Sequence, residues 1–396
     1  MVKLNDTNFG IDPLIDHIMS ILMSYFHKLR RKNKRKCAIL LLVTIALITG
    51  LYFLDDNTMI FTRVQLSKEP VIYLHHEPKI ILLWTPFFGS KDWSNQNLIG
   101  YRNSCSCLIT RDRSYLPHAS AVIFHWRDVG ARDLPIKYTN QKWIFFLVEP
   151  PPYTRRYFFL SKISPHFDCS ATYRQDSDFP TTYGCKYDLV PSDYQFHHVP
   201  VKNKRLAAWL ASDCDVISKR EEYVQQLKQY MPVDVYGKCG ENCDNKMVPC
   251  HQFIGENYLF YLAFENSVCK DYYTEKVVAK LQQDIVPVVM GGANYSQVLP
   301  TNSYIDIADF DSPQSLAEFL WTLSHDEKRY NSYFAWKSDP QFRSSKHCGD
   351  QWCRVCDKLA DPKAKCQHES GGFVDWWQTK ANCRSWYEIV PKSRRK

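Results

Sequence analysis

The feature that most limits the fold of this chain is a series of short apolar runs rich in β-branched and aromatic residues. Runs of this kind are typical of strands that are buried on both faces of a sheet. They fall into two sets: Lys79–Trp84, Ala121–Trp126 and Lys142–Val148, and then Arg205–Ala211, Val233–Tyr236, Tyr258–Phe264 and Ile285–Met290.

Helical patterns alternate with the second set of runs. They are Lys219–Tyr230 and Thr274–Gln283, followed after the last run by Pro313–Ser324 and Asp326–Lys337. Strands that alternate with helices predict an α/β fold with parallel sheets of the Rossmann type. Because the two sets join near residues 190–204, the sequence predicts two such domains that face a cleft.

A different kind of apolar run lies near the N-terminus. Cys37–Leu54 is 18 residues without a charge, and it follows a segment, 1–36, with eight basic and three acidic residues (8 − 3 = +5). This length just spans a thin bilayer, and the basic side is expected to stay cytoplasmic. The alternatives are a buried core helix and a cleaved signal peptide; the long leader and the lack of a small-x-small site argue against the latter.

The net charge of +8 is concentrated at the two ends of the chain. Residues 1–36 carry +5 and 392–396 carry +4, so the body, 37–391, is 8 − 5 − 4 = −1. A body without basic excess excludes a broad nucleic-acid-binding face. No P-loop or G-x-G-x-x-G pattern occurs, and the three Asp-x-Asp tripeptides (176–178, 213–215 and 309–311) do not by themselves predict a metal site.

The chain has 15 Cys, which is typical of an oxidising compartment. The C-terminal cluster contains a C-x-x-C with zinc-ligand spacing, and its members are His347, Cys348, Cys353, Cys356, Cys366, His368 and Cys383. In a secreted compartment the same pattern more often forms disulfides, which we therefore favour over zinc.

The segment Tyr258–Lys276 predicts a ligand site at the edge of a sheet. An apolar strand ends at Phe264, and Thr274 is a natural N-cap for the helix that follows. Lys276 in the first helical turn opposes the helix dipole unless an anion such as phosphate lies there. The alternative is that Lys276 points to water.

Several motifs together resemble the α1,3/4-fucosyltransferases of glycosyltransferase family 10. They are LLWTPF at 82–87, FLVEPPP at 146–152, TYRQDSDFPTTYG at 172–184, FENSVCKDYYTEK at 264–276, VPVVMG at 286–291, FDSPQSLAEFL at 310–320 and YFAWK at 333–337. The resemblance spans roughly residues 79–360 and implies a GT-B fold, two Rossmann-like domains facing a cleft, preceded by one transmembrane helix. It also implies a Golgi type II membrane protein with a luminal body.

The resulting expectation for the organisation of the chain has six parts. They are a cytoplasmic tail (1–36), a transmembrane signal anchor (37–54), a stem (55–78), an N-terminal acceptor and base domain (79–195), a C-terminal GDP-fucose-binding domain (196–340) and a Cys-rich tail (341–396) that packs back on the N-terminal domain.

The resemblance further implies an inverting transfer of L-fucose from GDP-fucose to a glycan. The family's base falls on Glu149, which follows an apolar strand and precedes three prolines. The family's pyrophosphate cations fall on Arg220, with Lys219 one residue away as an alternative, and on Lys276. Because cations replace the Asp-x-Asp metal, no metal site or essential cofactor is expected, and Mn²⁺ or Mg²⁺ would at most stimulate.

Other donor and acceptor positions also follow from the resemblance. Asn266, Tyr272 and Glu275 fall on positions that contact GDP-fucose, and Tyr273 competes with Tyr272. The family's His-His-aromatic/Arg segment, which influences acceptor choice, falls on His125, Trp126 and Arg127. Trp126 replaces the second His; it would either stack on a sugar ring or lie in the core.

The expected acceptor is the core GlcNAc of N-glycans on glycoproteins, as for invertebrate- and plant-like members. Lewis-type N-acetyllactosamine is the alternative, and a membrane-anchored carbohydrate-binding protein without turnover is an alternative of another class. The family's disulfides imply that Cys105 or Cys107 pairs with Cys353 or Cys356. For Cys239, Cys243 and Cys250 a local disulfide is expected, and a sequon at 294–296 lies inside the donor-domain motif.

Overall fold

The computed structural model describes part of the chain. The described residues are 66–67, 78–91, 93, 106–154, 157–183, 189–190, 194–195, 197–243, 248–342, 351–361, 365–366 and 372–390. The expected tail 1–36 and anchor 37–54, and most of the stem 55–78, lie outside them. Within the residues described, no helix has both the length and the apolar character needed to cross a membrane.

The first sheet is built from five parallel strands. They are β2 (Ile80–Leu83), β3 (Leu108–Thr110), β4 (Ala121–His125), β6 (Lys142–Leu147) and β7 (Cys169–Thr172), in the order β3-β2-β4-β6-β7. The two central strands β4 and β6 are almost wholly buried, as their continuous apolar sequences require. A short helix, α3 (Tyr157–Ile163), precedes β7, and two further short strands, β1 (Leu66–Ser67) and β5 (Lys137–Tyr138), pair apart from this sheet.

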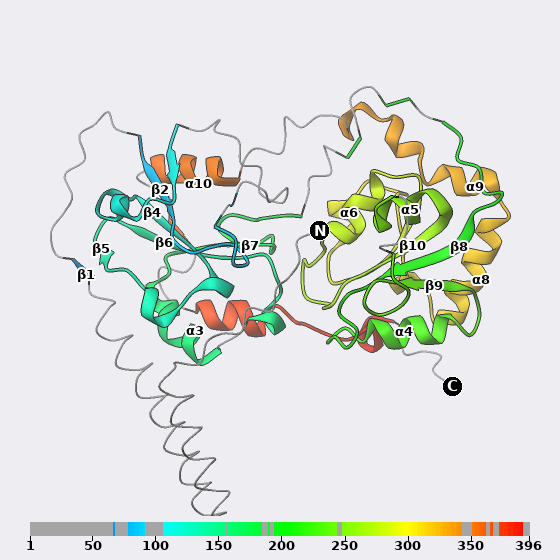
Figure 1. Cartoon of the computed structure of the whole chain (residues 1–396), viewed down its shortest axis with the longest axis horizontal. Coiled ribbons are helices and arrows are strands. Elements are labelled where there is room, and N and C mark those ends of the chain that lie inside the picture. The colour runs from blue at the N-terminus through cyan, green and yellow to red at the C-terminus, as the bar shows by residue number, and fades with distance from the viewer. Residues whose placement is uncertain are drawn as a thin grey trace, which may run out of the picture. The chain divides into compact units, whose positions relative to one another are not determined.

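The second sheet also has five parallel strands (Figure 1). They are β8 (Arg205–Leu210), β9 (Val233–Tyr236), β10 (Tyr258–Phe264), β11 (Val286–Met290) and β12 (Ile305–Asp306), in the order β12-β11-β10-β8-β9. Both sheets therefore have the parallel α/β architecture that the alternation of strands and helices predicts.

Helices cover both faces of the second sheet. Alternate residues of β10 explain how: Phe260, Leu262 and Phe264 pack with α4 (Arg220–Leu227) and α8 (Pro313–Ser324) in one core cluster. Tyr261 and Ala263 pack in the other cluster, with α5 (Cys250–Asn257) and α6 (Glu275–Leu281). The remaining helices of this part are α7 (Tyr295–Val298) and α9 (Glu327–Ser332).

The long apolar and amphipathic runs are the elements that the sequence predicts best. The observed bounds of β9, β10 and α8 coincide with the predicted ones, and the other predicted strands differ by one or two residues. The predicted helix 326–337 is instead a short α9 followed by a 3₁₀ turn, Ala335–Ser338. The short strands β3, β7 and β12 and the helices α5 and α10 (Gln351–Ala360) were not predicted.

Five disulfides join described residues: Cys107–Cys356, Cys169–Cys366, Cys214–Cys239, Cys243–Cys250 and Cys269–Cys383. Cys353 is disulfide-bonded as well. The first pair confirms one of the pairings expected from the family resemblance. The cysteines of the C-terminal cluster that the structure describes thus form disulfides, and the zinc alternative is wrong for them. The local disulfide expected near residue 243 is the pair Cys243–Cys250.

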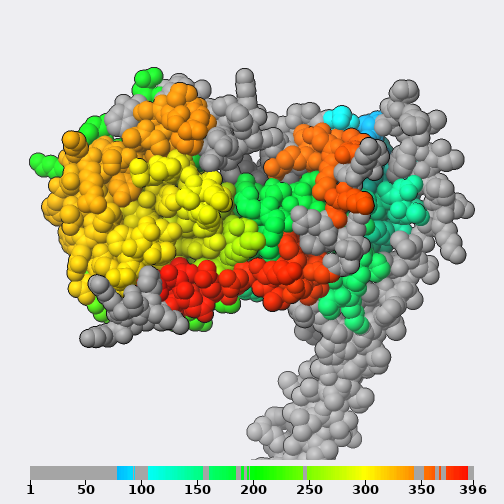
Figure 2. Space-filling view, turned by 180° about the vertical axis from the view of Figure 1, so that it is seen from behind, coloured from blue at the N-terminus to red at the C-terminus, as the bar shows by residue number. Residues whose placement is uncertain are grey.

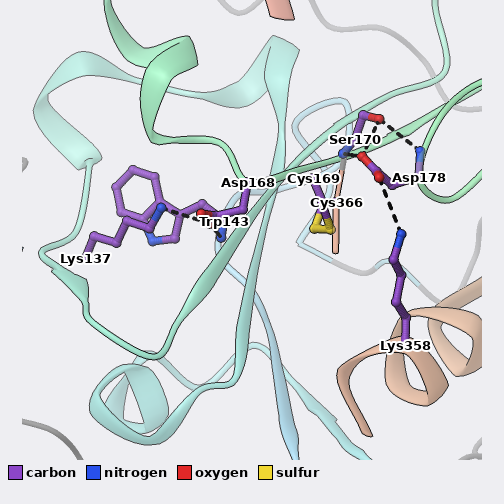
Figure 3. Close-up of a disulfide and its surroundings, with 8 residues drawn as sticks. All are labelled: Lys137, Trp143, Asp168, Cys169, Ser170, Asp178, Lys358 and Cys366. Atoms are coloured by element: carbon purple, nitrogen blue, oxygen red, sulfur yellow. Dashed lines mark hydrogen bonds and ion pairs between the residues drawn. A yellow bond between two sulfur atoms is a disulfide. The ribbon is translucent and has the colours of Figure 1, made fainter. Parts of the chain in front are cut away.

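Figure 3 shows how one disulfide and its neighbours fasten β7. Cys169 begins this strand and bonds to Cys366 of the tail. Asp168, just before it, accepts hydrogen bonds from the Lys137 ammonium and the Trp143 backbone. Asp178 accepts from the Ser170 backbone and hydroxyl and from Lys358 of α10 (Figure 3). Polar contacts therefore hold a strand whose sequence, CSAT, carries little strand propensity.

The C-terminal tail packs on both sheets. Trp352 of α10 contacts Phe146, and Trp377 contacts Phe145, both on β6. Further along, Trp386 packs against Tyr223 of α4. In the space-filling view the red residues near the C-terminus form a continuous strip at the surface, beside the yellow residues (Figure 2). The expected packing of the tail on the first sheet is thus accompanied by packing on the second.

Candidate active site

Glu149 lies at the carboxyl end of β6, in the first part of the chain. Pro150 follows, and a 3₁₀ turn, Pro151–Tyr153, then fixes the direction of the backbone. The Glu149 side chain is partly exposed and accepts a hydrogen bond from the Arg127 guanidinium. A carboxylate held at a strand end, partly open to solvent, is placed to receive a proton from a bound hydroxyl.

The neighbouring tripeptide His125–Trp126–Arg127 divides into two buried residues and one partly exposed residue. His125 is fully buried at the end of β4, and its Nδ1 lies 2.5 Å from Asp128 Oδ2. Burial lowers the pKa of His125, so the ring is neutral at pH 7. Trp126 is buried among Phe145 and Phe167. Of its two alternatives the structure shows the core position, which leaves no open ring face for a sugar.

Arg220 is the first residue of α4 and faces the edge of the second sheet. Its side chain is 3% exposed; Nη1 donates to the Phe264 carbonyl at 2.7 Å and Nη2 to the Asp213 carbonyl at 3.0 Å. Its Nε finds no partner among the described residues. The adjacent Lys219 is only half-buried and binds Asp215 at 2.9 Å. The geometry therefore favours Arg220 over Lys219 as the cation at the strand end.

Lys276 lies in the first turn of α6, beside a buried carboxylate. Its Nζ is 2.9 Å from Glu265 Oε2 and 2.9 Å from Thr274 Oγ1. Although burial alone would lower it, the Glu265 carboxylate holds the pKa of Lys276 above its usual value. The Lys276 ammonium therefore points to Glu265 and not to water. A bound anion is not needed to balance its charge, because the Glu265 carboxylate already does so. Thr274 is the N-cap that the sequence predicts.

Glu265 is a residue that the sequence analysis missed. It directly follows β10, is 1% exposed, and accepts hydrogen bonds from the Thr274 backbone at 2.8 Å and from the Thr274 hydroxyl. A charged residue immediately after a seven-residue apolar strand was the signal that could have found it.

Three consecutive carbonyls at the end of β10 bind Arg220 and Ser218. The Arg220 guanidinium binds the carbonyl of residue 264, the Ser218 hydroxyl binds that of Glu265 at 2.7 Å, and the Ser218 backbone N–H binds that of Asn266 at 3.1 Å. The charge of Arg220 is close enough to oppose protonation of Lys276. Both cations thus contact the chain where β10 ends, Arg220 at Phe264 and Lys276 at Glu265. This is the carboxyl edge of a parallel sheet, where α/β folds bind ligands.

The other predicted donor residues differ in their burial. Asn266 Oδ1 is buried and has no partner among the described residues. Tyr272 is buried, with its ring against Tyr173 and Tyr183, whereas Tyr273 packs in the core beneath α6. Glu275 is exposed, with Oε1 3.7 Å from Lys276 Nζ.

A hydrogen bond joins the segment of the base to the segment of the cations. The Tyr153 hydroxyl, four residues after Glu149, donates to Asp213 Oδ2 at 3.3 Å, and the carbonyl of the same Asp213 accepts from Arg220. Burial and the Asp213 carboxylate raise the pKa of Tyr153 to about 12, so the hydroxyl keeps its proton. A second link is the ion pair Lys270–Asp176 at 2.9 Å.

Two of the three Asp-x-Asp tripeptides form ion pairs with Lys or Arg side chains. Asp176 binds Arg174 and Lys270, Asp178 binds Lys358, and Asp215 binds Lys219. In the part of the chain that the structure describes, no group of three or more His, Cys, Asp or Glu side chains could hold a metal ion.

Comparison with known proteins places this arrangement in a family. A model described as "Fucosyltransferase, N-terminal" matches residues 76–184, and one described as "Glycosyltransferase family 10 (fucosyltransferase) C-term" matches residues 200–375. The chain belongs to glycosyltransferase family 10. This fucosyltransferase is 30% identical over 375 residues to alpha-(1,3)-fucosyltransferase C of Drosophila melanogaster, covering 85% of each chain.

Two further relatives have names that differ in the acceptor. The fucosyltransferase is 34% identical over 296 residues to glycoprotein 3-alpha-L-fucosyltransferase A of Drosophila melanogaster, covering 71% of this chain and 56% of that one. It is 34% identical over 350 residues to 4-galactosyl-N-acetylglucosaminide 3-alpha-L-fucosyltransferase FUT6 of Pongo pygmaeus, covering 85% of this chain and 93% of that one.

A solved structure confirms the fold. The fucosyltransferase matches a crystal structure of α1,3-fucosyltransferase with GDP-fucose at a TM-score of 0.52 and 14% identity, over 78% of this chain and 98% of that one. The family and the GT-B-like α/β fold expected from the motifs are therefore confirmed. The roles of the individual site residues remain predictions.

Proposed function

We propose that this fucosyltransferase transfers L-fucose from GDP-fucose, with inversion, in α1,3 linkage to GlcNAc of N-glycans. The observation that carries the proposal is the hydrogen-bonded connection between the segment of the candidate base and the segment of the candidate cations. The Tyr153 hydroxyl, four residues after Glu149, donates to Asp213, whose carbonyl accepts from Arg220. The charge of Arg220 in turn acts to lower the pKa of Lys276. A base and a pair of cations are the two groups that this chemistry needs.

These groups account for both the proton that is removed and the diphosphate that leaves. Glu149 takes the proton of the acceptor hydroxyl, whose oxygen forms a bond to the anomeric carbon of fucose. The bond between that carbon and the GDP oxygen breaks on the opposite face, so the configuration inverts. Arg220 and Lys276 stabilise the negative charge that develops on the leaving diphosphate. Asn266, Tyr272 and Glu275 are proposed to hold the rest of the donor.

The favoured acceptor is the core GlcNAc of N-glycans on glycoproteins. The similarity to glycoprotein 3-alpha-L-fucosyltransferase A supports it, as does Trp126, which replaces the second His of the family's acceptor segment. The second candidate is Lewis-type transfer to N-acetyllactosamine, which the similarity to the FUT6 enzyme supports. We further propose that residues 37–54 anchor the protein in the Golgi membrane with its body in the lumen.

The test is incubation of the full chain with GDP-fucose and each acceptor, comparing wild type with Glu149→Gln. We expect Glu149→Gln to lower kcat by at least about a hundredfold, because the amide cannot take the proton. The matched control is Glu318→Gln, at an exposed Glu of α8, with unchanged kcat. Failure of folded wild type to transfer fucose to either acceptor would support the carbohydrate-binding alternative. Full activity of Glu149→Gln would exclude this residue as the base.

A further inference from the structure

A tight turn after β2 exposes a large aromatic side chain in an unusual backbone conformation. Phe87 and Ser90 form an antiparallel bridge, and between them Phe88 has φ +48° and Gly89 has φ +77°. A bulky non-glycine residue at positive φ costs about 1–3 kcal/mol and persists only where its surroundings hold it. The Phe88 side chain is nevertheless 43% exposed. The turn therefore keeps an apolar ring at the surface at a cost in stability.

One carboxylate fixes this turn. Asp128 Oδ2 accepts the backbone N–H of Phe88 at 2.8 Å, and Oδ1 accepts that of Gly89 at 2.9 Å. The same Oδ2 binds His125 Nδ1. Although burial raises it, these hydrogen bonds from His125 and from the turn lower the pKa of Asp128 overall. Asp128 is therefore ionised at neutral pH, and the buried His125 orients the carboxylate that holds Phe88 in place.

The ring of Phe88 lies beside Arg127, the hydrogen-bond partner of the candidate base. Its centroid is 4.6 Å from that of His125 and 5.3 Å from the guanidinium carbon of Arg127. Arg127 in turn hydrogen-bonds Glu149. The partly exposed Phe88 ring, the Arg127 guanidinium over it and the Glu149 carboxylate thus form a series of contacts. Aromatic faces pack against the apolar C–H faces of sugar rings, while charged groups of this kind bind sugar hydroxyls.

We propose that Phe88 is the acceptor platform: a pyranose ring of the acceptor glycan stacks on Phe88 while its hydroxyls bind Arg127 and reach Glu149. The inference takes the identity of the acceptor from the proposed function. Its evidence is the strained turn, which holds the Phe88 ring at the surface. It assigns to Phe88 the stacking role that the sequence offered as one alternative for Trp126, which the structure buries.

The test uses the backbone strain to separate stability from binding. Phe88→Gly removes the ring and suits positive φ, so we expect a Tm equal to or above that of wild type. We expect the acceptor KM to rise about tenfold, equivalent to about 1.4 kcal/mol, while kcat at saturating acceptor and the KM for GDP-fucose stay within about twofold. Phe88→Trp keeps an aromatic face and should keep the acceptor KM of wild type.

A control and a binding measurement complete the test. Tyr230→Ala removes an aromatic residue that is 45% exposed after α4, and the acceptor KM should not change. Saturation-transfer NMR with N-acetyllactosamine and with chitobiose, in the presence of GDP, measures binding without turnover. Phe88-dependent binding by a wild type that transfers nothing would support the platform and refute the proposed function. Three outcomes would overturn the platform. The first is an unchanged acceptor KM or unchanged sugar binding in Phe88→Gly. The second is an equal loss in Phe88→Gly and Phe88→Trp, and the third is no sugar binding by wild type.

Discussion

At the scale of single residues, one of the two cations of the proposed donor site, Lys276, depends on a buried carboxylate. Glu265 is buried and holds both the ammonium of Lys276 and the N-cap Thr274. Part of the negative charge that the sequence predicts beside Lys276 is therefore supplied by the protein itself. We expect Glu265 to be a positioning residue, which directs the Lys276 ammonium toward the strand edge.

The first prediction concerns the variant Glu265→Gln. The amide keeps an oxygen for Thr274 but leaves Lys276 without its charge partner, so the ammonium is expected to turn toward Glu275 or solvent. We expect the KM for GDP-fucose to rise about tenfold and the free energy of unfolding to fall by about 1–3 kcal/mol, with kcat at saturating donor less affected. Steady-state kinetics and urea unfolding measure the two effects. An unchanged KM for GDP-fucose would show that Lys276 does not need this partner.

The second prediction is that a metal is not essential. Because Arg220 and Lys276 carry the positive charge proposed for the diphosphate, fucose transfer should persist in EDTA, with at most a modest decrease. The assay compares transfer before and after chelation and after addition of Mn²⁺ or Mg²⁺. Complete loss of transfer in EDTA that either metal restores would contradict the role given to the two cations.

The sequence and the structure differ most at this scale, for a physical reason. The family motifs lead to Glu149, Arg220 and Lys276 because a motif is local in the sequence. The Glu265–Lys276 ion pair and the Phe88–Asp128 contact join residues 11 and 40 positions apart, and only the fold brings them together. For the same reason the sequence left Trp126 undecided between surface and core.

At the scale of elements, the apolar runs predict the strands because parallel strands covered on both faces must be apolar throughout. β9 and β10 show this directly, since their predicted and observed bounds agree. β7 was missed because Cys169–Thr172 has no long apolar residue, and its burial comes from a disulfide and from the polar contacts of Asp178. α10 was missed because its Cys residues were interpreted as disulfide or zinc positions, although Trp352, Val355 and Cys356 recur at helical spacing.

The third prediction concerns the buried Lys280 of α6. Its ammonium donates to the His251 carbonyl at 2.6 Å, and burial lowers its pKa to about 8, from 10.5. Between these two values the unfolded chain binds more protons than the folded one, so raising the pH stabilises the folded state. Relative to Lys280→Met, wild type should therefore gain about 2 kcal/mol of unfolding free energy between pH 8 and pH 10.

Urea unfolding at several pH values measures this gain. The matched control is Lys228→Met, at an exposed lysine after α4, whose difference from wild type should not change in this pH range. A constant difference between wild type and Lys280→Met would mean that Lys280 stays charged in the folded protein up to pH 10.

At the scale of the whole molecule, the C-terminal tail connects parts that the sequence treats as separate. It binds the first sheet through Trp352 and Trp377 and the second through Trp386. Near the donor residues the contact is continuous: Arg384 pairs with Val268, the Lys270 backbone N–H binds the Ala381 carbonyl, and Cys383 bonds to Cys269. The sequence predicts that the tail folds back, but not this path, because its Cys and Trp residues have no periodic pattern.

The last prediction tests whether this path stabilises the molecule. Cys269 and Cys383 are 114 residues apart, whereas Cys243 and Cys250 are seven apart. A cross-link that closes a longer loop removes more entropy from the unfolded chain, so replacing Cys269 and Cys383 by Ser should cost about 3–4 kcal/mol of unfolding free energy. Replacing Cys243 and Cys250 by Ser, the matched control, should cost about 2 kcal/mol.

Because Cys269 lies between Asn266 and Tyr272, the variant without Cys269 and Cys383 should also raise the KM for GDP-fucose, and the control should not. Equal losses of stability, or an unchanged donor KM in the variant without Cys269 and Cys383, would show that the tail only covers the donor segment and does not hold it in place.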